Sequence, residues 1–132
     1  MLLDGVSVPE RPGEIRACLK VRNEALRLAS VFDHHRALGV DRFLVIDDGS
    51  TDGTLDYLTA QPDTHVLRGE GGFAETRSGL RWVNTALNAF CDGHWTLTID
   101  ADEQFIFPGF EQVGLRALCG HLDQSQVCGV FA

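Results

Sequence analysis

Hydrophobic residues along this chain alternate between short apolar runs and longer stretches with helical spacing. The run Phe43–Ile46 is continuously apolar, as expected of a parallel strand buried on both faces. We expect it and Trp95–Ile99 to be interior strands of a sheet. The full set of predicted strands is Ala17–Val21, Arg42–Ile46, His65–Leu67, Trp95–Ile99 and Val127–Phe131.

Helical spacing, with apolar residues three or four positions apart, separates these strands. Gly39 is a typical stop signal for the first helix, and Pro62 ends the second. The predicted helices are Glu24–Leu38, Asp52–Thr59, Glu75–Cys91 and Phe110–Leu122. The alternating order predicts an α/β fold with a doubly wound, mainly parallel sheet and right-handed crossovers.

Polar residues follow four of the predicted strands. They are Arg22 to Glu24, Asp47 to Ser50, Arg68 with Gly69, and Asp100 with Asp102. Parallel strands bring their carboxyl ends to one edge of a sheet, where doubly wound folds bind their ligands. We therefore expect Asp48 and Asp102 to lie at the same edge, within reach of one ligand.

The segment Asp100–Glu103 is the most informative motif. Two carboxylates one residue apart at a strand exit can share a divalent cation and its bound phosphates, and oxygen ligands suit Mg²⁺ or Mn²⁺. A solvated acidic turn is the alternative interpretation. Asp47 and Asp48 likewise either cap their loop or accept a hydrogen bond from a base N–H or a sugar hydroxyl.

Other motifs are less convincing. The loop that begins at Asp48 imitates a calcium site, but position 12 is Thr59 rather than a bidentate glutamate. The glycine-rich stretch 69–72 is not followed by the Gly-Lys-Ser/Thr of a phosphate-binding loop. His34 and His35 occupy neighbouring positions that point in different directions on a helix, so we interpret both as structural.

Composition narrows the function classes. The chain has 132 residues, 44% of them hydrophobic, which predicts one domain with a real core. A net charge of −8 makes nucleic acid an unfavourable partner, and a small anion would need a bridging cation. Four cysteines without metal-site spacing predict free thiols. No signal peptide or transmembrane segment is recognisable, so we expect a cytoplasmic protein, with the inner membrane face as the alternative location.

Four segments together resemble the family 2 glycosyltransferases, which have the GT-A fold. They are Lys20–Glu24, Asp47–Thr54, Glu75–Leu80 and Ile99–Glu103, in the family's order and spacing. The resemblance covers roughly residues 16 to 108. The Asp-x-Asp-Glu ending looks like a bacterial subgroup of the family.

The resemblance implies roles for single residues. Asp48 would bind the nucleobase of a nucleotide-sugar, with Asp47 beside it. Asp100 would hold the ribose or the metal shell, and Asp102 would ligate the metal that bridges the diphosphate.

Three further residues complete the implied donor site. Arg77 would lie near the base and the diphosphate, and Asn23 and Glu24 would line the pocket from the first strand. The implied cofactor is Mn²⁺ or Mg²⁺.

By the same resemblance, the donor would be a nucleotide-diphosphate sugar, usually a UDP-sugar, and the acceptor a hydroxyl on a glycan, lipid or protein. No residue here fits the catalytic base, which we expect beyond Ala132 together with the acceptor half. Residues 1–132 would then be a donor-binding domain.

Two other functions compete with this interpretation. One is a non-catalytic remnant or fragment that binds nucleotide-sugars. The other is a sugar-phosphate nucleotidyltransferase, which Lys20–Glu24 disfavours because it lacks the glycines of a triphosphate loop.

Overall fold

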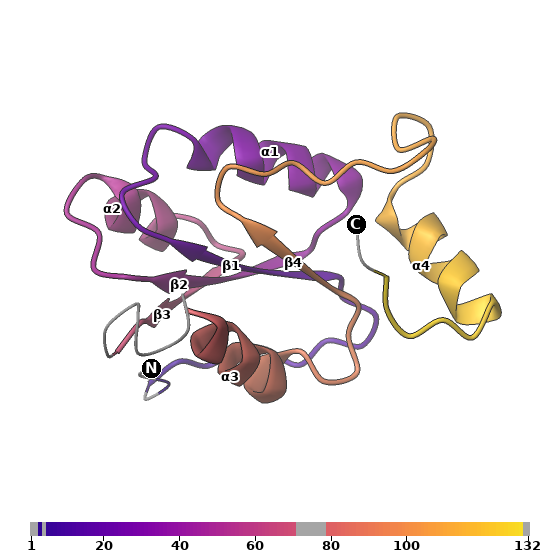
Figure 1. The fold of residues 1–132 in the computed structure, drawn as a ribbon, viewed down its shortest axis with the longest axis horizontal. Helices are drawn as coiled ribbons and strands as arrows, with labels where there is room; N and C mark the ends of the chain where they lie inside the picture. The colour runs from indigo at the N-terminus through magenta and orange to yellow at the C-terminus, as the bar shows by residue number, and fades with distance from the viewer. Residues whose placement is uncertain (1–2, 4, 71–78, 131–132) are drawn as a thin grey trace.

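The computed structural model describes residue 3 and residues 5–70 and 79–130 of the chain. Its centre is a four-stranded parallel sheet in the order β3-β2-β1-β4, with helices on both faces (Figure 1). The elements in chain order are β1 (Arg16–Val21), α1 (Leu28–Leu38), β2 (Arg42–Asp47), α2 (Thr54–Thr59), β3 (Thr64–Arg68), α3 (Leu80–Phe90), β4 (Thr96–Asp100) and α4 (Leu115–Gln124).

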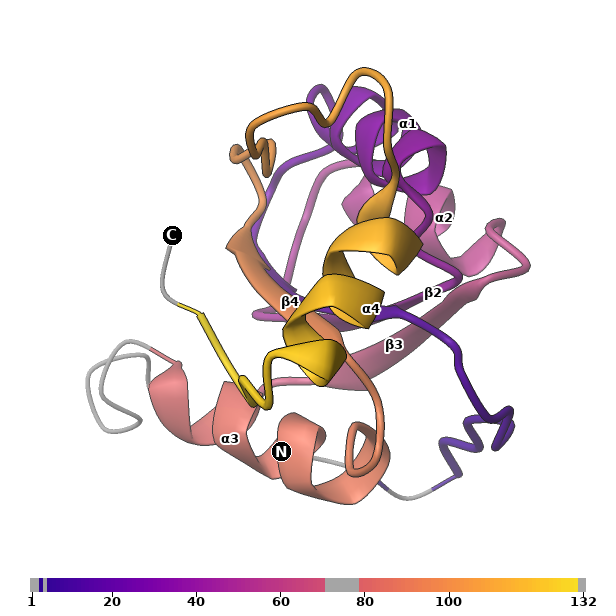
Figure 2. The same ribbon diagram turned by 90° about the vertical axis from the view of Figure 1, so that its right-hand side faces the viewer.

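The sheet separates two hydrophobic layers. Helices α1 and α2 cover one face and α3 covers the other, as the turned view in Figure 2 shows. On the first face, Phe32 of α1 stacks on Phe43 of β2 with ring centroids 4.2 Å apart. On the second, Leu44 and Ile46 of β2 pack against Trp82 of α3. The alternating side-chain directions of a strand supply both layers from the same two central strands.

The predicted α/β fold with a parallel sheet is confirmed. The chain runs from β1 through β2 to β3 on one side, and then α3 carries it back so that β4 pairs with the other side of β1. The strand order therefore reverses between β1 and β4. In an open sheet, the crevice beyond the carboxyl ends of strands at such a reversal is the usual ligand site.

One strand prediction was half wrong. Strand β2 is interior and buried at every position, but β4 has a single neighbour, β1, in the part of the chain that the structure describes. Only Ile99 of β4 is buried. The alternating threonines Thr96 and Thr98 fit this edge position, because an edge strand with one covered face needs apolar residues at alternate positions only.

Several predicted boundaries also change. Residues 127–130 form no strand in this structure, so the described part of the predicted fifth strand is wrong. Helix α1 begins at Leu28 rather than Glu24, and α4 begins at Leu115 rather than Phe110, because turns precede both helices. Gly39 ends α1 as predicted, in the left-handed conformation with φ 110°.

Candidate functional site

A pocket of about 240 Å³ opens at the carboxyl edge of the sheet, at the reversal between β1 and β4. Its lining residues come from β1, β4, the loops after β1, β2 and β4, and α3: Lys20, Val21, Arg22, Glu24, Asp48, Trp82, Asp100, Ala101 and Asp102. Asp48 and Asp102 thus lie at the same edge of the sheet and line one pocket, as the sequence predicted. Their individual roles stay predictions.

Two carboxylates of the pocket form ion pairs with basic residues of the first strand and the loop after it. Lys20 and Asp100 are partners in the β1·β4 register, and Lys20 Nζ lies 3.4 Å from Asp100 Oδ1. Arg22 Nη1 lies 3.4 Å from Asp48 Oδ2. The acidic pocket is therefore already partly neutralised by cations of the chain itself.

A third pair lies at the mouth of the pocket. Arg27 Nη1 donates a hydrogen bond of 2.8 Å to Glu24 Oε2. This bond raises the pKa of the Arg27 guanidinium, and the negative charge of Asp102 raises it further. Glu24 lines the pocket as predicted, with a basic partner of its own.

The acidic motif itself folds into a tight turn after β4. The backbone N–H of Asp100 donates to Glu103 Oε2 at 3.0 Å, and the N–H of Glu103 donates to the Asp100 carbonyl at 3.1 Å. Glu103 therefore closes the turn, and Asp100 and Asp102 line the pocket.

The number and arrangement of the carboxylates in this pocket can be compared with what a metal ion requires. Among the described residues, no group of three His, Cys, Asp or Glu side chains is arranged to hold an ion by itself. Mg²⁺ in phosphate-transfer sites is usually bound by one or two carboxylates, with water and substrate phosphates completing the shell. The two carboxylates Asp100 and Asp102 fit that second arrangement.

Two of the predicted donor-binding residues are absent from the pocket lining. Asp47 is buried, with 7% of its surface exposed, and its carboxylate accepts hydrogen bonds from the Ser50 N–H at 3.3 and 3.2 Å. Asn23 has a positive φ of 56°, and its side-chain oxygen accepts from the Thr51 N–H at 2.8 Å. Both side chains hold the loops after β1 and β2 in position.

The remaining predicted residue, Arg77, lies outside the described residues, so its place near the base and the diphosphate stays a prediction.

The sequence interpretation gave no site role to three lining residues, Lys20, Arg22 and Trp82. The sequence feature that could have identified Lys20 as a site residue is its position as a charged residue within an otherwise apolar predicted strand. Trp82 is almost fully buried, at 3% exposure, and its indole N–H donates to the Glu70 carbonyl at 2.8 Å. A Cβ added at Gly69 would lie 3.0 Å from the indole ring. The glycine therefore permits the close contact that makes Trp82 a wall of the pocket.

The segment after the acidic turn is tied to α1 by two histidines. His35 is fully buried, and its Nε2 accepts from the Phe105 N–H at 3.2 Å while its Nδ1 lies 2.7 Å from the Val31 carbonyl oxygen. His34 Nε2 contacts the Phe105 carbonyl oxygen at 2.7 Å. Burial lowers the pKa of His35, which matches a neutral ring. The structural interpretation of both histidines agrees with these contacts.

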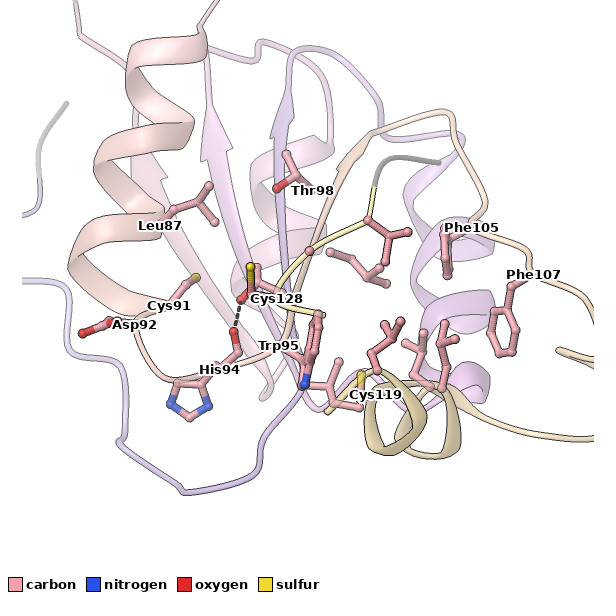
Figure 3. A pocket seen from close by; sticks show the side chains of 18 of the residues that line it. Leu87, Cys91, Asp92, His94, Trp95, Thr98, Phe105, Phe107, Cys119 and Cys128 are labelled. Atoms are coloured by element: carbon pink, nitrogen blue, oxygen red, sulfur yellow. Dashed lines mark hydrogen bonds between the residues drawn. The ribbon is translucent and has the colours of Figure 1, made fainter. Parts of the chain in front are cut away.

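A larger cavity of about 790 Å³ is lined by residues of β4, α4 and the end of α3 (Figure 3). Its walls are mainly apolar, with Leu87 and Trp95 among them, and it contains no carboxylate of the acidic motif or of Asp48. Cys91 and Cys128 also line it, and all four cysteines of the chain are free thiols. Its size alone therefore does not make this cavity the chemical site.

None of the helices in the described residues is both long and apolar enough to cross a bilayer.

Comparisons with known proteins bear on the fold and the family of the chain. No curated protein matches the chain significantly in sequence. Among solved structures, the chain is similar to the one titled "Crystal structure of S. aureus TarS 1-349", with a TM-score of 0.59 and 18% sequence identity. That match covers 90% of this chain and 38% of the TarS chain, so it supports the fold. The family model described as glycosyl transferase family 2 matches residues 17–114, which include β2, β3, β4 and all of β1 except Arg16. With most of its length matched, the chain belongs to glycosyl transferase family 2.

Proposed function

We propose that this chain is the donor-binding part of a glycosyltransferase. It would bind a nucleotide-diphosphate sugar, a UDP-sugar in our proposal, through Mn²⁺ or Mg²⁺ and transfer the sugar to an acceptor hydroxyl. One observation carries the proposal: in a family 2 chain, the fold brings Asp48, Asp100 and Asp102 into a single pocket at the strand-order reversal.

The size of the pocket indicates which part of the donor it would hold. Its volume of about 240 Å³ is smaller than the ~300–1,000 Å³ of typical small-molecule sites. It therefore suits the metal and diphosphate end of a donor. The nucleoside would extend out of the pocket along the sheet edge, on the side where Asp48 of the loop after β2 lines it.

The three carboxylates would have separate roles. Asp100 and Asp102 would hold the metal, which when bound neutralises the negative charge that develops on the leaving diphosphate. Asp48 would accept a hydrogen bond from the base N–H or a sugar hydroxyl. Because the chain carries a net charge of −8, a diphosphate needs local positive charge before it can approach.

Thermal unfolding tests the metal bridge. UDP together with Mn²⁺ should raise the melting temperature more than either alone, and ligand at ~100 times its dissociation constant would add ~2.7 kcal/mol of stability. Equal stabilisation by UDP in EDTA would show that the metal bridge is wrong. Release of UDP from a UDP-sugar would then separate a transferase from a pure binding module, which releases none.

Calorimetric titration of two matched variants tests the assignment of roles. Asp102→Asn should weaken Mn²⁺ binding and the binding of UDP with it, because the metal shell loses a charge. Asp48→Asn should weaken UDP binding and leave Mn²⁺ affinity close to wild type. If Asp48→Asn abolished Mn²⁺ binding while Asp102→Asn did not, the loop after β2 would be the metal site instead.

A further inference from the structure

Lys20 occupies an unusual position in the sheet. Strand β1 lies between β2 and β4 and is otherwise buried, whereas 34% of the Lys20 side chain is exposed at its carboxyl end. The side chain lies in the pocket, with its ammonium 3.4 Å from Asp100 Oδ1. An ion pair is thus present where the proposed function places a metal ligand.

The residue type is as informative as the position. The chain has eleven lysines and arginines, and Lys20 is the only lysine among them. Some ion pairs elsewhere use arginine forks: Arg36, for example, donates two hydrogen bonds of 2.8 Å to Asp63. A lysine offers a compact point charge without the fixed fork of a guanidinium, so it can change partners without a matched planar geometry.

The pair with Asp100 is suited to exchange. It is a single contact of 3.4 Å, and 57% of the Asp100 side chain is exposed, so solvent screens the attraction. The aliphatic stem is confined, because a Cβ added at Gly79 would lie 3.2 Å from Lys20 Cδ. The ammonium group can therefore move within the pocket while the stem stays in place.

The charges of the pocket require such an exchange when a metal binds. Four carboxylates line it against two basic side chains, and Arg27 pairs with one of the carboxylates at the mouth. The pocket therefore keeps an excess of negative charge that a bound cation would reduce: Glu24, Asp48, Asp100 and Asp102 against Lys20, Arg22 and Arg27. With the metal on Asp100, an ammonium held at the same carboxylate would repel it. In the proposed complex, the donor diphosphate brings a new anionic partner for the ammonium into the same pocket.

We propose that Lys20 is the resident counter-cation of Asp100, displaced by the metal and then paired with the donor diphosphate. The inference rests on the proposed function and adds a positioning residue to it. Lys20 holds Asp100 in the pocket while the metal is absent, and it contributes to diphosphate binding once the metal has taken its place.

Because the chain has one lysine, lysine labelled with ¹³C at the ε carbon gives a single side-chain NMR signal that reports on Lys20 directly. Mg²⁺ alone should shift this signal, and UDP added at saturating Mg²⁺ should shift it again. In Asp100→Asn, the signal should already lie away from its wild-type position without metal. A Lys20 signal unmoved by saturating Mg²⁺ would overturn the exchange.

A matched pair of variants tests the energetic consequence. Lys20→Met keeps the stem and removes the charge, and Arg22→Met removes one charge from the Asp48 side of the same pocket. Electron paramagnetic resonance titration should show Mn²⁺ binding to Lys20→Met about two- to fivefold more tightly than to wild type, the range expected for losing an exposed ion pair. At saturating Mn²⁺, its affinity for UDP should fall about tenfold, as expected for a lost hydrogen bond to a charged group.

The Arg22→Met variant should change Mn²⁺ affinity less than Lys20→Met does. Equal changes in the two variants would mean that only the overall charge of the pocket matters, and would overturn the specific exchange. If Lys20→Met fails to fold, the wild-type NMR titration still decides. A wild-type protein that binds neither Mn²⁺ nor UDP would overturn the proposed function itself, a result distinct from both of these.

Discussion

Acid should destabilise this protein through a histidine that holds the segment after the acidic turn. His35 is fully buried on α1 and accepts the Phe105 N–H through Nε2. Since Nε2 is the acceptor, Nδ1 carries the proton and donates to the Val31 carbonyl. Protonation of the ring would set an Nε2–H group against the Phe105 N–H at a fully buried side chain.

The sign of the pH dependence follows from the pKa. Burial lowers the pKa of His35 from its usual 6.5, so below that value the unfolded chain binds more protons than the folded one. The contribution of His35 to the free energy of unfolding is therefore fully present above pH 6.5 and decreases as the pH falls below that value. The loss between pH 7.5 and 5.5 has an upper limit of about 1.4 kcal/mol for one histidine, which is the value for a ring that never protonates in the folded state. A loss at this limit would lower the melting temperature by roughly 5 °C.

His65 contributes to the pH dependence in the same direction, because burial and then the charge of Arg42 also lower its pKa. A substitution distinguishes the contribution of His35 to the pH dependence from that of His65. His35→Asn removes the acceptor for the Phe105 N–H and should cost about 1–3 kcal/mol at pH 7.5. It also removes the titration, so the stability gap to wild type should shrink at pH 5.5, by at most about 1.4 kcal/mol.

Urea unfolding at pH 7.5, 6.5 and 5.5 measures this gap. Working above pH 5 avoids a separate loss of stability from Glu14 and Asp63. The carboxyl pKa of each is lowered in the folded protein, so these groups affect stability only in more acidic solution. Gly114→Ala serves as a destabilised control without a titrating group, and its gap to wild type should not change with pH. A His35→Asn gap that stays constant, or widens in acid, would refute the reasoning.

Two further predictions concern stability and use matched pairs. A Cβ at Gly114 would lie 2.9 Å from the Leu38 carbonyl oxygen, so Gly114→Ala should destabilise by about 1–3 kcal/mol in urea unfolding. Gly120→Ala, inside α4 with no atom within 4 Å of the new Cβ, should instead stabilise by about 0.5–1 kcal/mol; equal effects would contradict the steric argument. Glu14 is buried and pairs with Arg42 at 2.5 and 2.9 Å, so Glu14→Gln should cost about 3–5 kcal/mol by leaving a buried guanidinium uncompensated. Glu10→Gln, at an exposed carboxylate, should change the melting temperature little, and a comparable loss there would show that burial of the pair is not the cause.

The sequence determined the local elements and one edge of the sheet. Short apolar runs separated by helical spacing fixed the four strands to within one or two residues, because burial on a pleated or helical surface imposes those periods. Parallel strands necessarily bring their carboxyl ends together. The meeting of Asp48 and Asp102 in one pocket could therefore be predicted without a structure.

The tertiary structure decided which strands are neighbours. The sequence of β4 is compatible with an interior or an edge position, and only the return of the chain across the sheet placed it beside β1. The pair between Lys20 and Asp100 is a consequence of that placement, because the two residues lie 80 positions apart and meet only through the β1·β4 register.

Side-chain direction at the strand ends was also decided by the fold. Asp47 and Asp48 are adjacent and chemically identical, and a strand sends successive side chains to opposite sides. The sequence alone does not say which of them faces the pocket. The pairing of β2 with β1 and β3 turned Asp47 toward the Ser50 N–H and left Asp48 at the pocket, because the packing of whole strands sets the side on which each carboxylate lies.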